Sequence, residues 1–132
     1  MELLSLAEAQ RVAAAAEARA EEIGHPMNIA VVDAGAHLLA FARMDGAILA
    51  SIDISTRKAV TAVLMNMSTA DLYDAAQPGA PLYGIETTNA GLVAFGGGLL
   101  LRRGDDVVGA VGVSGGAVEQ DVDVATAAAG AL

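Results

Sequence analysis

The chain contains no cysteine and no tryptophan, and it has only two phenylalanines and two tyrosines. The lack of cysteine excludes disulfides, thiolate metal sites and a cysteine nucleophile. Because aromatics are scarce, alanine, glycine and valine carry most of the hydrophobic character, and each of these side chains buries little area. A chain of this kind gains stability by burying surface against copies of itself, so we expect a homo-oligomer.

Basic residues are also few: 7 lysines and arginines face 16 aspartates and glutamates, which gives a formal net charge of −9. This charge argues against nucleic acid or an anionic membrane surface as a partner. No apolar run reaches transmembrane length. The N-terminal segment carries charges throughout, unlike a signal peptide, so we expect a cytoplasmic protein. The length of 132 residues predicts one domain over 1–132.

Hydrophobic periodicity and turn residues predict an α+β fold, with an antiparallel sheet covered by helices on both faces. Ser5 and Glu8 form a capping-box pattern before the first helix, and Asp45 is the expected cap of the second. Residues 82–98 are the hardest to assign, with a short helix or strand near 92–95. The remaining expected helices are 6–23, 47–67, 68–76 and 118–131, and the expected strands are 27–33, 37–44, 99–103 and 107–114.

A G-x-S-x-G pattern surrounds Ser114, at the junction of the last strand and the last helix. This pattern is typical of serine hydrolases, in which the histidine base lies downstream of the serine. Both histidines of this chain, His25 and His37, lie far upstream. We therefore interpret Ser114 as part of a structural turn.

The same turn offers backbone N–H groups at Gly115 and Gly116, beside a helix N-terminus that suits a carboxylate or phosphate ligand. The alternative is that Glu119 or Asp121 occupies this positive helix end as a local cap.

A second candidate site combines His37, Arg43, Asp45 and Lys58. Regular alternation along the expected strand 37–44 puts His37 and Arg43 on one face, and Asp45 follows in the turn. With Lys58 from the next helix, these residues form a polar pocket for an acidic ligand. The alternative is an Arg43–Asp45 turn network with a solvated Lys58. No metal site is predicted, because the two histidines lack a third ligand at suitable spacing.

Three stretches resemble the GlcG/HbpS-like family, which includes the C-terminal domain of PduO. The stretches are IAVVDAGAHLLAFARMDGA (29–47), STRKAVTA (55–62) and VVGAVGVSGGAVEQD (107–121). The resemblance implies a profilin-like antiparallel sheet flanked by helices, assembled into oligomers. It also implies haem as a candidate ligand, although the residues alone leave the cofactor unidentified. Its family-like positions are Asp33, His37, Arg43, Asp45, Lys58, Glu119 and Asp121.

We therefore predict an oligomeric protein that binds a small ligand. One alternative is a cofactor-independent isomerase, cyclase or lyase that acts on a small acidic or carbonyl substrate. In that enzyme, His37 or Glu119 would be the base, and Arg43 or Lys58 would stabilise developing charge. Another alternative is a non-catalytic scaffold subunit, in which the charged residues serve only the oligomer interface.

Overall fold

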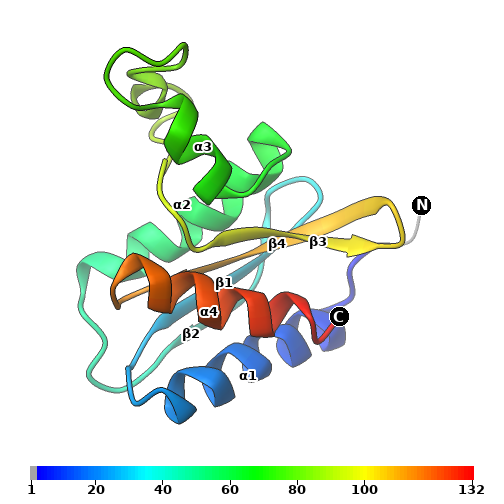
Figure 1. The fold of residues 1–132 in the computed structure, drawn as a ribbon. Coiled ribbons are helices and arrows are strands. Elements are labelled where there is room, and N and C mark those ends of the chain that lie inside the picture. The colour runs from blue at the N-terminus through cyan, green and yellow to red at the C-terminus, as the bar shows by residue number, and fades with distance from the viewer. Residues whose placement is uncertain (1–2) are drawn as a thin grey trace.

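The computed structural model describes residues 3–132. Its centre is a four-stranded antiparallel sheet in the order β2-β1-β4-β3, with helices on both faces (Figure 1). The strands are β1 (Asn28–Asp33), β2 (Leu38–Arg43), β3 (Gly98–Arg103) and β4 (Asp106–Ser114). The helices are α1 (Leu6–Glu22), α2 (Ala50–Met65), α3 (Thr69–Ala75), η1 (Ile85–Thr87) and α4 (Val118–Ala129). The predicted α+β fold is confirmed.

The first helix begins as its sequence predicts. The side chain of Ser5 accepts a hydrogen bond from the backbone of Glu8, and the Glu8 carboxylate accepts one from the backbone of Ser5. This reciprocal pair satisfies two N–H groups that an uncapped helix leaves free. The Glu8 carboxylate also pairs with Arg103 on β3, which ties the start of α1 to the sheet.

The main hydrophobic core lies between the sheet and the pair α1 and α4. Small residues such as Ala16 and Ala20 let α1 approach closely, while Ile29, Val31 and Val111 point into this core from the sheet. A smaller cluster lies on the opposite face, where α2 packs on β1, β3 and β4. Gly112 makes this second packing close, because a Cβ atom there would collide with the backbone oxygen of Ser55.

The second long helix begins later than its sequence predicts, and Asp45 does not cap it. α2 starts at Ala50 with Leu49 as its N-cap, and no side chain bonds the cap. The physical reason is Gly46, which adopts a φ of +82°. This left-handed conformation cannot begin a right-handed helix, so residues 44–49 form a loop with a turn at 45–46. The helix also ends early, because Asn66 takes a left-handed conformation as its C-cap.

A β-bulge changes which residues of β2 share a face. The pairing of β1 with β2 shifts register between Val31 and Val32. As a result Leu39 packs with the main core, whereas Phe41 pairs with Ala30 on the α2 side. Regular alternation, which would put Leu39 with Phe41, is therefore wrong here, because a bulge inserts one unpaired residue. The expectation of a short helix or strand near 92–95 is also wrong, because these residues form neither.

Candidate functional site

A buried ion pair joins α2 to α4 at one end of the sheet. The Lys58 ammonium lies 2.9 Å from the Asp121 carboxylate, and it donates a 2.8 Å hydrogen bond to the backbone oxygen of Val113 on β4. Both charged side chains are almost fully buried. Burial of this kind requires pairing and full hydrogen bonding. Three elements of the fold therefore meet at Lys58.

The segment before β3 closes over the same ammonium. The Lys58 nitrogen lies 4.9 Å from the centre of the Phe95 ring, a cation–π distance. Gly97 fits against the lysine only because it lacks a side chain, since a Cβ atom there would lie 2.5 Å from the Lys58 nitrogen. Lys58 is thus in contact with the Phe95 ring and packs closely against Gly97.

Asp121 fills the helix end that the sequence offers to an anion. Its second carboxylate oxygen accepts a 2.9 Å hydrogen bond from the backbone N–H of Gly116. The neighbouring N–H of Ala117 donates to Gln120. Gly115 provides the turn itself, with a φ of +146°. The α4 N-terminus is thus capped by its own residues, as the local-cap interpretation expects.

Burial shifts the pKa values of the ion pair towards each other. Desolvation lowers the pKa of Lys58, and the attraction of Asp121 opposes that shift only in part. Desolvation likewise raises the pKa of Asp121, against the opposing effects of Lys58 and the Gly116 N–H group. Loss of either partner would leave the other charge buried without compensation.

Phe95 also forms a wall of a surface pocket. The pocket has a volume of about 370 Å³ and is lined by Ala70, Tyr73, Phe95, Gly96, Val118 and Glu119. A second pocket of about 270 Å³ adjoins it and shares Tyr73 and Phe95. Two of the four aromatic residues of the chain therefore meet here. This volume and apolar lining match small-molecule sites.

Sequence reasoning singled out Glu119 as a possible base or helix cap, and the structure places it in this pocket. The two aromatic rings of the pocket were missed. Tyr73 comes from α3, Phe95 from the segment before β3, and Glu119 from the first turn of α4. Only the tertiary fold brings these three segments together. The available signal was the rarity of aromatic residues in the chain, since aromatic rings are enriched at binding surfaces.

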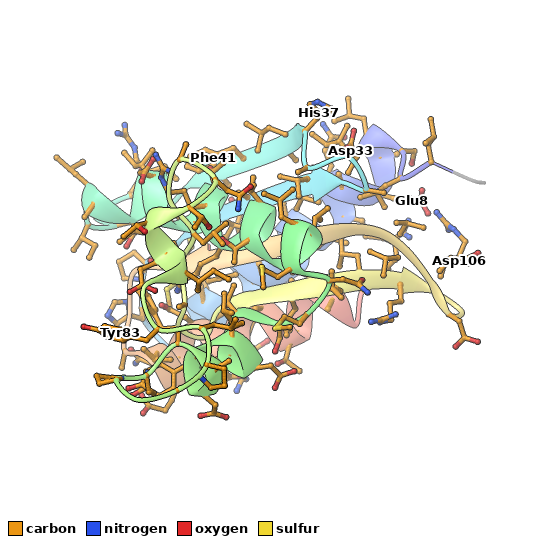
Figure 2. The ribbon with its side chains drawn as sticks, turned by 90° about the horizontal axis from the view of Figure 1, so that it is seen from above. Glu8, Asp33, His37, Phe41, Tyr83 and Asp106 are labelled. Atoms are coloured by element: carbon orange, nitrogen blue, oxygen red, sulfur yellow. The ribbon has the colours of Figure 1, made fainter. Side chains whose placement is uncertain are left out.

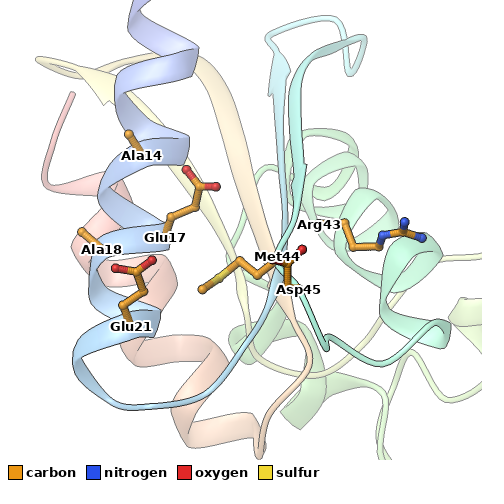
Figure 3. Close-up of a pocket in the computed structure, with 7 residues that line it drawn as sticks. All are labelled: Ala14, Glu17, Ala18, Glu21, Arg43, Met44 and Asp45. Atoms are coloured by element: carbon orange, nitrogen blue, oxygen red, sulfur yellow. The ribbon is translucent and has the colours of Figure 1, made fainter.

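Arg43 and Asp45 lie at a different place, beside α1. They line a pocket of about 580 Å³ together with Glu17, Glu21 and Met44. Figure 3 shows Met44 extending towards α1, which carries Glu17 and Glu21, whereas Arg43 extends away from α1. The arginine does not neutralise these carboxylates, so the pocket is acidic.

Asp33 and His37 lie at the opposite end of the sheet, in the β1–β2 hairpin (Figure 2). The Asp33 carboxylate accepts hydrogen bonds from the backbone N–H groups of Gly35 and His37, as in an Asx turn. At the usual rise of a strand, His37 lies about 20 Å from Arg43. The structure therefore does not assemble the predicted pocket of His37, Arg43 and Lys58.

Ser114 is buried, and its hydroxyl lies 2.8 Å from the hydroxyl of Ser51 on α2. Within residues 3–132, the hydroxyl of Ser114 has no hydrogen bond to a histidine. A serine without a base is not activated as a nucleophile. The contact instead fastens the end of β4 to α2.

The model of the HbpS-like family, described as "Haem degrading protein HbpS-like", matches residues 4–130. This chain belongs to the HbpS-like family. It is 50% identical over 119 residues to a 15.0 kDa protein from the dhaT-dhaS intergenic region of Citrobacter freundii, which covers 89% of the chain and 84% of that protein. The predicted family resemblance is thereby confirmed.

Two further comparisons involve PduO. The chain is 44% identical to the corrinoid adenosyltransferase PduO of Citrobacter freundii over 98% of its own length, but it spans only 39% of that protein. The crystal structure of a PduOC:haem complex superposes with a TM-score of 0.95 at 39% identity, covering 99% of this HbpS-like chain and 96% of the other.

Proposed function

We propose that this HbpS-like chain binds haem in the pocket lined by Tyr73 and Phe95, as a subunit of a homo-oligomer. The observation that supports the ligand is the close likeness of the whole chain to a protein solved with haem bound. None of the helices within residues 3–132 is long and apolar enough to cross a membrane. We also propose a cytoplasmic location for this chain.

The residues present fit one face of a planar macrocycle. Phe95 and Val118 offer apolar surface, and the small residues Ala70 and Gly96 leave room beside them. Aromatic rings favour offset stacking on a flat conjugated ligand. The two adjoining pockets form a shallow surface around the shared rings of Tyr73 and Phe95, which suits a ligand with one face bound and one exposed.

The pocket also contains a donor for iron. The phenol oxygen of Tyr73 is of a type that ligates haem iron in proteins, and the Tyr73 side chain is about half exposed. Tyr73 would hold the iron, whereas Phe95 and Val118 would pack on the macrocycle. When bound, haem supplies an iron centre for redox or gas-binding chemistry.

The residues expected from the sequence take different parts in this proposal. Glu119 lines the pocket. Lys58, Asp121, Gly115 and Gly116 support it, because the ion pair holds Phe95 on one side and the start of α4 on the other. Arg43 and Asp45 lie outside it, as do Asp33 and His37.

A haemin titration of the purified protein, followed by absorbance, tests the proposal. We expect a saturable Soret shift at one haemin per subunit. Tyr73→Phe should change the Soret and charge-transfer bands, because the phenol oxygen is lost while the ring remains. Tyr83→Phe is the matched control, since this exposed tyrosine lines neither of the two adjoining pockets. Absence of a saturable shift in the wild-type protein would refute haem binding.

A further inference from the structure

The two faces of the sheet are covered unequally. α1 and α4 together contact all four strands on one face, whereas on the other face α2 packs on β1, β3 and β4. Phe41 of β2 pairs with Ala30 on the α2 side and stays 37% exposed. The outer edge of β2 is also free, because β2 is the first strand of the sheet. An open edge beside an uncovered apolar face is a surface that natural proteins usually cover.

The turn after β2 extends this apolar surface. Ile48 and Leu49 are 57% and 72% exposed, and they immediately precede α2. The Asn28 side chain bonds the backbone oxygen of Ile48, and Asn28 pairs with Arg43 across the strands. This places the turn beside the end of β2. We call Phe41, Arg43, Asp45, Ile48 and Leu49 the β2 surface.

The charges of the β2 surface are not used within the chain. Each of the other six lysines and arginines makes a hydrogen bond or ion pair. Within residues 3–132 neither Arg43 nor Asp45 makes one through its side chain, and both are exposed. The chain as a whole has a net charge of −9, but these two residues sum to zero. Arg43 and Asp45 therefore add no net charge to an interface between two copies, and each can attract the opposite charge of a second copy. The acidic Glu17 and Glu21 near Met44 belong to α1, which covers the other face of the sheet.

We propose that the β2 surface binds the same surface of a second copy of this chain around a twofold axis near Met44. Such an axis relates residues 43 and 45, so Arg43 of each subunit faces the partner subunit's Asp45. It also brings Phe41 towards the partner subunit's Ile48 and Leu49. A twofold interface must be self-complementary, and this surface carries both charges and both halves of the apolar contact. The inference rests on the proposed homo-oligomer and does not depend on haem.

The test is assembly mass, measured by sedimentation and light scattering over a range of protein concentrations. Arg43→Glu should produce a smaller assembly and raise its dissociation constant at least about tenfold, because like charges then face each other. Asp45→Arg should do the same, and the double variant should restore the wild-type mass. Arg102→Glu is the matched control, because Arg102 is an exposed arginine on β3, the opposite edge strand.

An apolar pair of variants gives an independent check. Phe41→Ser should weaken assembly, whereas Tyr83→Ser should not, although Tyr83 is the more exposed ring. Circular dichroism of each variant verifies folding. A monomeric wild-type protein, an unchanged mass for Arg43→Glu or a failure of the double variant to recover would each overturn the inference. If the protein is a monomer that binds haemin, the proposed interface is wrong and the proposed ligand stands. If it is a dimer that binds no haemin, the proposed ligand is wrong and the interface stands.

Discussion

Each end of the sheet carries an aspartate beside a basic side chain, but the two pairs differ in burial. At one end, Lys58 and Asp121 lie 2.9 Å apart with side chains 0% and 3% exposed. At the other end, His37 lies 3.6 Å from Asp33, and its side chain is 84% exposed. The buried pair organises a helix start, a strand end and the wall of a pocket. The exposed pair organises only its own turn, so the two pairs differ both in burial and in how much of the fold they join.

The largest effect should come from breaking the buried pair. Lys58→Met leaves the Asp121 carboxylate buried without its partner, which should lower the free energy of unfolding by about 3–5 kcal/mol. Urea denaturation at fixed protein concentration measures this change in the free energy of unfolding. The double variant Lys58→Met with Asp121→Leu should lose much less than the sum of the two single variants. Additive losses would show that the two charges do not stabilise each other.

The next effect should come from Ser114, at the same buried end. Ser114→Ala leaves the buried Ser51 hydroxyl without this partner and should cost about 1 kcal/mol. Haemin affinity should stay within a few-fold of wild type, because the serine lies outside the pocket. Labelling of Ser114 by a fluorophosphonate would contradict the structural interpretation of the G-x-S-x-G pattern.

A comparable but more local loss is expected at the exposed end. Asp33→Ala removes two hydrogen bonds to backbone N–H groups in the hairpin turn. The cost should be about 0.5–1.5 kcal/mol in thermal or urea unfolding. Asp33→Asn is the matched control, because its amide oxygen still accepts both hydrogen bonds, and it should retain most of the stability. Equal losses for both variants would mean that the carboxylate charge matters more than the turn.

The smallest effect should come from His37. Its ring is mostly exposed, and an exposed contact of this kind contributes little, at most about 1 kcal/mol. His37→Ala should therefore leave the melting temperature close to that of wild type. A loss as large as that of Lys58→Met would remove the distinction between the two ends.

Local signals in the sequence predicted the fold well. The Ser5–Glu8 capping box, the two hairpins and the final helix all depend on residues within a few positions of each other. The prediction that Asp45 caps the second long helix was wrong, because Gly46 adopts a left-handed conformation that helix propensity does not specify. The prediction that His37 and Arg43 share a face of the strand was wrong, because a β-bulge depends on pairing with another strand and cannot be read from one strand alone.

The site was harder to predict, because its contacts join distant parts of the chain. Lys58 and Asp121 were both singled out, but 63 residues separate them and no spacing rule pairs them. Tyr73 and Phe95 escaped notice because neither belongs to a motif. Their shared pocket exists only once α3, the segment before β3 and the first turn of α4 have come together in the fold.

A paired haemin titration tests the placement of the ligand most directly. Ala70 is exposed and lines the pocket of Tyr73 and Phe95, so Ala70→Phe fills that pocket without entering the core. We predict that Ala70→Phe weakens haemin binding at least about tenfold, a loss of about 1.4 kcal/mol. His37→Ala, at the far end of the sheet, should leave the affinity unchanged. Strong haemin binding by Ala70→Phe together with lost binding by His37→Ala would contradict the account and move the site to the exposed end.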